Sequence, residues 1–550
     1  MSALNDSNKP AVPHTFDFVV VGAGSAGCVL ASRLSESGRF SVALLEAGGS
    51  DRNLWVTMPL AFGKLYGDAA VNWGYRSEPE PGLDGAISYQ ARGKLLGGTG
   101  SINGLTYMRG HRADYDRWRA LGNVGWGYDD LLPYFRGAEQ HVRGDGPYHG
   151  AQGPINVIDA PRHVLGEAFV DAAGRCGFPF NPDVTGESAE GFGRPQMTVR
   201  NGRRSSSAAE YLRPALRRSN LHVFQHCLVA GVVFENKVAK AVVFQCDGVE
   251  QRIAARCEVI LCAGAFNSPQ LLQRSGVGPA DLLREHGIDI VADLPGVGGD
   301  LEDHFGVNLA YRCTHSITVT DEVVHPIRRA AMMLDYLVRR RGALAGNASY
   351  CIGFMRTAPH LPIPDAHISL LGWARGDPRP DAKHFGLYRF PAFTLVVSLM
   401  RPESRGSVQI RDLDPASAPR IRFNFFQSEA DQQALLSALR IARRIMSSAP
   451  ICEYVAAELI PGPAVQSDEE WLAFCRSQGR STHHAAGTCK MGSGPRSVVD
   501  ARLRVKGVRG LRVVDSSVMP SMVAGNINST VIVIAEKGAA MILEDHKNPQ

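Results

Sequence analysis

A glycine run near the N-terminus has the spacing of a nucleotide-binding turn. The run is GAGSAG at residues 22–27. Its first glycine allows a tight turn, its second lets the backbone approach a pyrophosphate, and its third lets a helix pack closely on a strand. A carboxylate that could bind a ribose follows 19 residues after the last glycine. The pattern predicts a dinucleotide site with contacts from Gly22, Gly24, Ser25, Gly27, Glu46 and Ala47.

A pair of histidines near the C-terminus could do acid–base chemistry. His483 and His484 are adjacent in THHAAGTCKMG. A neutral imidazole, with an ordinary pKa of about 6.5, is suited to accept a proton near neutral pH. We expect an extended segment here, in which adjacent side chains point in opposite directions and only one histidine faces the reacting group. Asn526 and Asn528, in GNINST, could donate a hydrogen bond to a substrate oxygen and stabilise developing negative charge.

The elements around these residues have the pattern of an α/β fold. The β-branched run FDFVVV at 16–21 predicts a buried parallel strand that leads into the glycine turn. CVLASRLSES then has helical spacing, and FSVALLEAG predicts a second buried strand, which completes a β-α-β unit. Antiparallel strands are predicted at 221–234 and 241–245, a strand that turns into a helix at 258–276, helices near 324–340 and 432–447, a strand at 511–515, and a closing helix from 527.

Composition excludes several classes of protein. The 550 residues, 44% hydrophobic and 21% charged, are enough for more than one globular domain. A net charge of +5 without a long basic block gives no indication of nucleic-acid binding. The richest basic stretches, Arg217–Arg218 and residues 339–341, are interpreted as solvated helix faces. There is no GxSxG or HExxH motif and no cluster of metal ligands, so no metal is predicted.

Cysteine usage and hydropathy indicate a compartment. The 11 cysteines are scattered, without CxxC spacing, and several lie in apolar runs, which is typical of buried thiols in a reducing compartment. No run of eighteen apolar residues occurs, and the polar N-terminus lacks the apolar centre of a signal peptide. The sequence therefore predicts a cytoplasmic, soluble protein without an integral membrane segment.

Four ordered motifs resemble those of the glucose–methanol–choline (GMC) oxidoreductase family. They are RGKLLGGTGSINGLTYMRGHRADYDRW (92–118), GAFNSPQLLQRSGVG (264–278), THHAAGTCKMG and DSSVMPSMVAGNINST. The resemblance extends from Phe16 to Leu543. Several scaffold stretches look most like the bacterial branch that contains sorbose, choline and aliphatic-alcohol dehydrogenases.

The resemblance implies an α/β fold with two domains. A Rossmann-like FAD-binding domain would comprise residues 1–155, 205–315 and 481–550. A substrate domain, an antiparallel sheet flanked by helices, would comprise 156–204 and 316–480. The implied reaction is oxidation of a primary alcohol or polyol by hydride transfer to flavin N5, with electrons passed to a quinone or other acceptor. An O2-using oxidase of the same family and an FAD-containing cyanohydrin lyase remain as alternatives.

The family pattern also assigns residues. It places the catalytic base at His484, separated by two residues from Gly487-Thr488-Cys489, and its partner at Asn528, with Asn526 a turn or cap residue beside the cofactor. Ile102 occupies the position at which some relatives carry a histidine bonded covalently to the flavin, so non-covalent FAD is expected. His304 would buttress the flavin domain, and the substrate pocket would be lined mainly by residues 316–400 and the loops near 60–75. The remaining cofactor contacts would be Arg92, Gly97, Gly98, Gly100, Asn103, Val229, Ala263, Gly264, Asp515 and Asn526.

Overall fold

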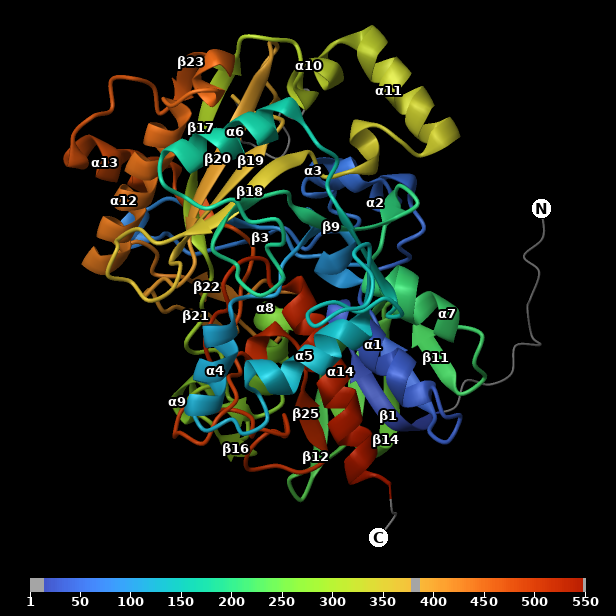
Figure 1. The fold of residues 1–550 in the computed structure, drawn as a ribbon. Coiled ribbons are helices and arrows are strands. Elements are labelled where there is room, and N and C mark those ends of the chain that lie inside the picture. The colour runs from blue at the N-terminus through green and yellow to red at the C-terminus, as the bar shows by residue number, and fades with distance from the viewer. Residues whose placement is uncertain (1–13, 377–385, 548–550) are drawn as a thin grey trace.

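The structure, a computed structural model, describes residues 14–376 and 386–547 and contains two large sheets (Figure 1). In the first, β1 (Thr15–Val21), α1 (Ser25–Ser35) and β2 (Val42–Leu45) form the predicted β-α-β unit. The two strands pair in parallel, with Val21 opposite Leu45. All of β2 and most of β1 are buried, which explains why these strands read as continuous apolar runs.

The first sheet has the strand order β11-β2-β1-β14-β13-β12, and β25 also pairs with β14. The strands β11, β2, β1, β25 and the second half of β14 run parallel, whereas β12 and β13 form an antiparallel hairpin against the first half of β14. The prediction of one continuous strand over 221–234 was wrong. His226, with a φ of +58°, breaks it, and residues 221–224 pair in parallel with β2. The bounds are β11 (Leu221–Phe224), β12 (Cys227–Glu235), β13 (Val238–Cys246), β14 (Val249–Leu261) and β25 (Leu511–Val513).

Helices cover this sheet. α1 and α14 (Asn528–Asp545) lie side by side against it, and α5 (Tyr128–Ala138) packs on α14 (Figure 1). α14 is buried over most of its circumference, in keeping with its nearly uninterrupted apolar sequence. Because the strands are parallel, their carboxyl ends meet at one edge of the sheet, where such folds bind ligands. None of the helices in the described residues is long and apolar enough to cross a bilayer.

The second large sheet is antiparallel, as the family resemblance implied. Its order is β18-β19-β20-β17-β23, and the short β24 also pairs with β17. Helices α6 (Val164–Arg175), α12 (Glu429–Met446) and α13 (Asp468–Gln478) pack against it. The strands are β17 (Phe305–Cys313), β18 (Ser349–Met355), β19 (Ala366–Leu371), β20 (Ala392–Leu399), β23 (Val455–Ile460) and β24 (Arg480–Ser481). β17 is thus an inner strand of this sheet, although our sequence limits grouped residues up to 315 with the FAD-binding segments.

Shorter elements connect the two sheets. A small sheet comprises β5 (Thr106–Tyr107), β6 (Glu139–His141), β7 (Ile155–Asp159), β9 (Gln196–Arg200) and β10 (Arg203–Arg204). Other helices used below are α2 (Leu54–Thr57), the 3-10 turn η1 (Pro59–Ala61), α3 (Phe62–Leu65), α8 (Gly264–Arg274), α10 (Val319–Val324) and α11 (Pro326–Arg339). The pairing of Phe305 in β17 with Ser481 in β24 brings His304 beside residues 482–484. Strand pairing therefore assembles the histidines from two distant segments.

Candidate active site

A cavity of about 340 Å³ lies at the carboxyl ends of β1, β2 and β14. Its wall runs from the turn after β1, past the N-termini of α1 and α14, to residues 482–485. Most of the site residues predicted from the sequence line it: His484, Asn528, Gly22, Gly24, Ser25, Glu46, Ala47, Arg92, Gly98, Asn103, Val229, Ala263, Gly264, Asp515 and Asn526. The other three, Gly27, Gly97 and Gly100, pack behind the lining residues.

The glycines leave a bare backbone surface for a dinucleotide. Gly22 has a φ of +95°, which favours glycine, and a Cβ on Gly27 would lie 1.9 Å from the Gly22 carbonyl oxygen. A Cβ on Gly98 would lie 2.7 Å from Cα of Gly24. The two glycine-rich loops therefore touch through their backbones, and the N-terminus of α1 faces the cavity beside them. This surface fits the pyrophosphate of FAD.

Glu46 and Asp515 are the acidic groups of the described cavity wall. Glu46 accepts hydrogen bonds from the backbone N–H groups of Ala23 (2.9 Å) and Gly48 (2.8 Å), yet burial raises its pKa to about 7. A carboxylate has about four acceptor positions, so two remain for a ribose diol. Asp515 accepts from the backbone N–H of Gly264 at 2.8 Å, and burial raises its pKa as well. Both side chains are held in place and can still accept further hydrogen bonds.

His484 is fixed by contacts at both ring nitrogens. Its Nε2 lies 3.0 Å from Nδ2 of Asn526, and its Nδ1 lies 2.9 Å from both Thr482 Oγ1 and His304 Nδ1. The Thr482 hydroxyl can donate to the carbonyl oxygen of His304 at 3.3 Å, which leaves its own oxygen free to accept from Nδ1–H of His484. This pattern fits a proton on Nδ1 and a lone pair on Nε2, beside the Asn526 amide. Thr482 was not among the predicted site residues.

The structure places a different asparagine beside His484 from the one that we predicted. Asn526, which we had interpreted as a turn residue, contacts His484, whereas Asn528 accepts a 2.6 Å hydrogen bond from the Ser25 hydroxyl at the start of α1. The cause is the backbone ahead of α14. Gly525 has a φ of +78°, so the chain turns Asn526 toward His484, while Asn528 already belongs to the first turn of the helix beside the glycine loop.

The neighbouring histidine does not follow the predicted extended geometry. His483 has a φ of +67°, and both His483 and His484 line the cavity. The His483 ring meets Tyr66 edge-on with 5.5 Å between centroids, and its carbonyl oxygen accepts from Nη1 of Arg92 at 2.7 Å. Nδ1 of His483 has no hydrogen-bond partner in the part of the chain that the structure describes. Hydrogen bonding at both ring nitrogens, rather than direction alone, therefore distinguishes His484.

Burial keeps these imidazoles neutral. Desolvation lowers the pKa of His484 well below its ordinary value, and His304 and His483 reinforce the shift because they would repel a second positive charge. Burial lowers the pKa of His304 and of His483 to about 3. Near neutral pH the Nε2 lone pair of His484 is therefore available as a base.

Aromatic rings form the wall near the histidines. Tyr66 and Trp73 come from the predicted loops near 60–75, and Tyr75 and Phe266 lie beside them in the cavity wall. We expected residues 316–400 to supply most of the substrate pocket, but none of those that the structure describes lines this cavity. That segment lies behind the site instead. Met400, for example, accepts a hydrogen bond from the backbone of Gly525 through its sulfur at 3.1 Å.

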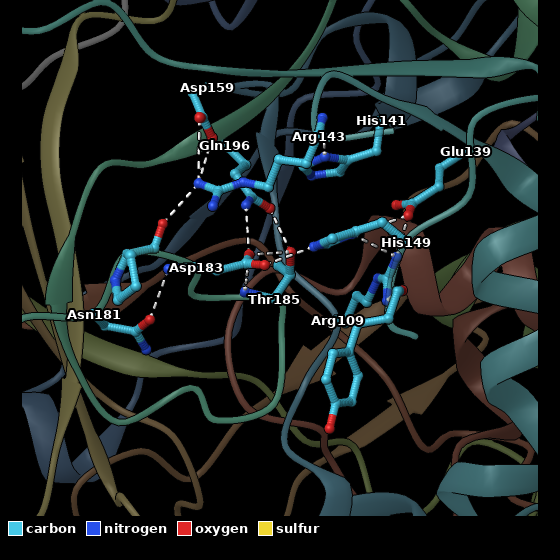
Figure 2. A network of polar contacts seen from close by, with 12 residues as sticks. Arg109, Glu139, His141, Arg143, His149, Asp159, Asn181, Asp183, Thr185 and Gln196 are labelled. Carbon is cyan, nitrogen blue, oxygen red and sulfur yellow. Dashed lines mark hydrogen bonds and ion pairs between the residues drawn. The ribbon is translucent and has the colours of Figure 1, made fainter. Parts of the chain in front are cut away.

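A second cluster of ionisable side chains lies outside the cavity (Figure 2). Glu139, His141 and His149 each place a possible ligand atom within 4.8 Å of the others. Two features oppose a metal ion here. Arg109 already pairs with Glu139, and the His141 and His149 rings are stacked at 3.8 Å and 22°, so their in-plane lone pairs cannot converge on one ion at bonds of about 2.1 Å. His149 also contacts Asp183 at 2.7 Å, which completes a buried ionic network.

Comparison with known proteins places the chain in a family. The family models described as GMC oxidoreductase match residues 16–306 and 402–535. The mitochondrial choline dehydrogenase of Mus musculus is 41% identical over 97% of this chain and 91% of that protein. The oxygen-dependent choline dehydrogenase of Photobacterium profundum is 39% identical over 96% of this chain and 93% of that protein.

Solved structures agree over nearly the whole chain. Pyridoxine 4-oxidase from Mesorbium loti has a TM-score of 0.86 at 30% identity and covers 97% of this chain and 100% of its own. A variant of formate oxidase from Aspergillus oryzae RIB40 has a TM-score of 0.90 at 27% identity and covers 97% of this chain and 99% of its own. Together with the glycine surface and the His484 site, these matches show that the chain belongs to the GMC oxidoreductase family and is an FAD-dependent oxidoreductase that acts on CH–OH donors.

Proposed function

We propose that the protein oxidises an uncharged primary alcohol or polyol, with His484 as the base and Asn526 as the donor that holds the substrate oxygen. The observation that carries this proposal is the 3.0 Å contact between Nε2 of His484 and the Asn526 amide in the cavity wall. A substrate hydroxyl bound between them would pass its proton to Nε2, and the amide would stabilise the developing negative charge. Bound FAD supplies the acceptor for the hydride that leaves the carbon.

The lining argues against choline as the substrate. A quaternary ammonium needs a carboxylate or an open aromatic face. The carboxylates of the described wall, Glu46 and Asp515, are bonded to the turns that follow β1 and β14. Lys94 lies 4.6 Å from the Trp73 ring centroid, and Arg92 lies 4.7 Å from that of Phe266. Cations of the chain itself already occupy two of the four rings in this wall, and on this ground we propose an uncharged alcohol.

We also propose that the FAD is held without a covalent bond. Ile102 carries no nucleophile, and its side chain is buried in an apolar cluster with Val56, Leu65, Val71 and Leu95. Acid precipitation of the purified protein is expected to release the flavin into the supernatant. A yellow pellet would contradict this proposal.

A quinone is the proposed electron acceptor, and the cytoplasm the proposed location. All 11 cysteines are free thiols in the structure, which suits a reducing compartment. Oxygen remains the alternative acceptor, since some of the similar proteins are named oxidases. The alternative function, a cyanohydrin lyase, is not favoured, because the similar proteins are named as dehydrogenases and oxidases.

Anaerobic mixing of the flavin-loaded protein with alcohols tests the proposal. The panel contains aliphatic, aromatic and polyol substrates together with choline, and the flavin absorbance is followed. We expect bleaching by an uncharged alcohol, recovery with a quinone dye, and slow recovery in air. A His484→Gln variant that keeps its flavin is expected to bleach at least about a hundredfold more slowly. Bleaching by choline alone would overturn the substrate proposal, and unchanged bleaching by the variant would overturn the role of His484.

A further inference from the structure

Helix α11 turns an apolar face to solvent. Ile327 is 75% exposed, Leu334 64% and Val338 72%. The spacing of these residues places them on one stripe of the helix, together with the exposed Ala331. In Figure 1 the helix projects from the body of the protein above α2 and α3.

The opposite face of α11 is also apolar, and it is buried. Tyr336 is fully buried there and packs with Met58, Leu344, Met332 and Met333. A surface helix normally presents a polar face to water. In α12, for comparison, the exposed central positions are Gln433, Arg440 and Arg444. The inner face of α11 already supplies the packing that the fold needs. Its outer apolar stripe therefore indicates a surface that binds another molecule or a membrane.

Arginines are frequent along and just after this helix. Between residues 326 and 341 there are five arginines and a single aspartate. Arg328 pairs with the buried Asp321, and Arg339 pairs with Asp335. Arg329 and Arg341 have no ion-pair partner among the residues that the structure describes, so their charge is available to an external anion. An apolar stripe on an arginine-rich helix is the pattern of a helix that lies in the interface of an anionic membrane.

We propose that α11 docks the protein on an anionic phospholipid surface, with Ile327, Leu334 and Val338 among the acyl chains and the arginines of residues 326–341 drawn to the headgroup charge. The position of the helix relates this surface to the cavity. Through Met58 and its neighbours α11 packs on η1, which leads through α3 to Tyr66 in the cavity wall. A lipid-soluble acceptor in the membrane would then lie close to the flavin site. This last step rests on the quinone proposed above.

Vesicle flotation of the full-length, flavin-loaded protein tests the docking. We expect binding to vesicles of phosphatidylcholine with phosphatidylglycerol, weaker binding to phosphatidylcholine alone, and release at high salt. Leu334→Glu is expected to lower the partition coefficient at least about tenfold. Replacing Arg329 and Arg341 by glutamine is expected to lower it roughly 25-fold, from about fivefold for each arginine near the surface. Val124→Glu, at an apolar residue that is 80% exposed elsewhere, is the matched control and is expected to change nothing.

Several results would overturn the docking proposal. The first is no binding to anionic vesicles, and the second is an equal loss of vesicle binding in Leu334→Glu and Val124→Glu. The third is a dimer in size-exclusion chromatography that Leu334→Glu converts to a monomer without affecting vesicle binding. The last result would mean that a second copy of the chain covers the stripe. Turnover with a soluble dye is expected to be equal in all variants, so a failure of the proposed oxidation is visible separately. Vesicle binding without reduction of vesicle-embedded quinone would uphold the docking and refute only the acceptor.

Discussion

Replacing Asn526 by alanine is expected to slow anaerobic reduction of the bound flavin by about two orders of magnitude. The Asn526 amide lies 3.0 Å from Nε2 of His484 in a buried site, where it would donate to the substrate oxygen as that oxygen becomes negative. A hydrogen bond to a charged group is worth about 1.5–3 kcal/mol, and burial favours the upper end of this range. At about 1.4 kcal/mol per factor of ten, 3 kcal/mol corresponds to roughly 150-fold. Removal of an oxyanion donor in other enzymes costs about 10²–10³-fold.

The matched variant, Asn528→Ala, removes a similar side chain two residues away. Asn528 accepts a 2.6 Å hydrogen bond from the Ser25 hydroxyl, and the pair lies at the glycine turn rather than at the histidine. A hydrogen bond between neutral groups is worth about 0.5–1.5 kcal/mol. We therefore expect up to about tenfold weaker FAD binding and a rate of flavin reduction within about threefold of the unchanged protein.

Stopped-flow absorbance of both variants, saturated with FAD and mixed anaerobically with the best alcohol of the panel, decides between the two asparagines. Flavin content is measured on the same samples, so that a loss of cofactor is not mistaken for slow chemistry. The reasoning is refuted if Asn528→Ala slows reduction a hundredfold while Asn526→Ala does not. Equal slowing of both would mean that the helix start acts as a unit and that the His484–Asn526 contact has no separate role.

Four further outcomes are expected. Thr482→Val should lower kcat about tenfold, with Thr482→Ser restoring it, because a hydroxyl fixes the tautomer of His484; equal rates in both variants would contradict this. Because the pKa of His484 lies well below 6.5, its neutral form persists to that pH, and kcat/KM should be flat above pH 6.5 and fall only at lower pH; an acid limb centred above pH 7.5 would exclude this assignment. Gly27→Ala should yield protein without FAD, since its Cβ would lie 1.9 Å from a carbonyl oxygen; normal flavin content would show that the turn can shift. Glu139→Gln should lower the free energy of unfolding in urea by about 3–5 kcal/mol, because it leaves the buried Arg109 without its ion-pair partner. The control Asp145→Asn, at an exposed ion pair, should lower it by under about 1 kcal/mol. Similar losses in the two variants would refute the distinction.

Local patterns in the sequence predicted the strand, the turn and the helix that surround the glycine-lined end of the cavity. The run FDFVVV, the glycine turn and Glu46 lie within about thirty residues of one another, and each follows a local rule of strand, turn or helix. The structure adds the reason for Gly98, which touches Gly24 through its backbone. That contact joins two segments more than seventy residues apart, and no periodicity predicts it.

The catalytic end depended on contacts that spacing does not specify. Asn526 and Asn528 are equivalent in type and close in sequence, and a single turn at Gly525 decides which one reaches the histidine. Thr482 matters because its hydroxyl lies between His304 and His484, which the pairing of β17 with β24 brings together. The limit placed at residue 315 separated β17 from β20 and β23, its neighbours in the sheet, because an antiparallel strand such as β17 gives no signal of the sheet to which it belongs.

The same burial sets the limits of both catalysis and stability in acid. His304, His483 and His484 are neutral in the fold because the surrounding protein disfavours their charged forms. In the unfolded chain each would bind a proton below pH 6.5. Between that pH and the lower folded pKa the unfolded state binds more protons, so the free energy of unfolding falls as the pH is lowered. His304 and His483, whose folded pKa values lie near 3, would each weaken the fold by about 2 kcal/mol between pH 6.5 and 5. This loss of stability in acid and the proposed chemistry have one cause. The neutral imidazole of His484, desolvated at the junction of β17 and β24, is the form that could take a proton from an alcohol.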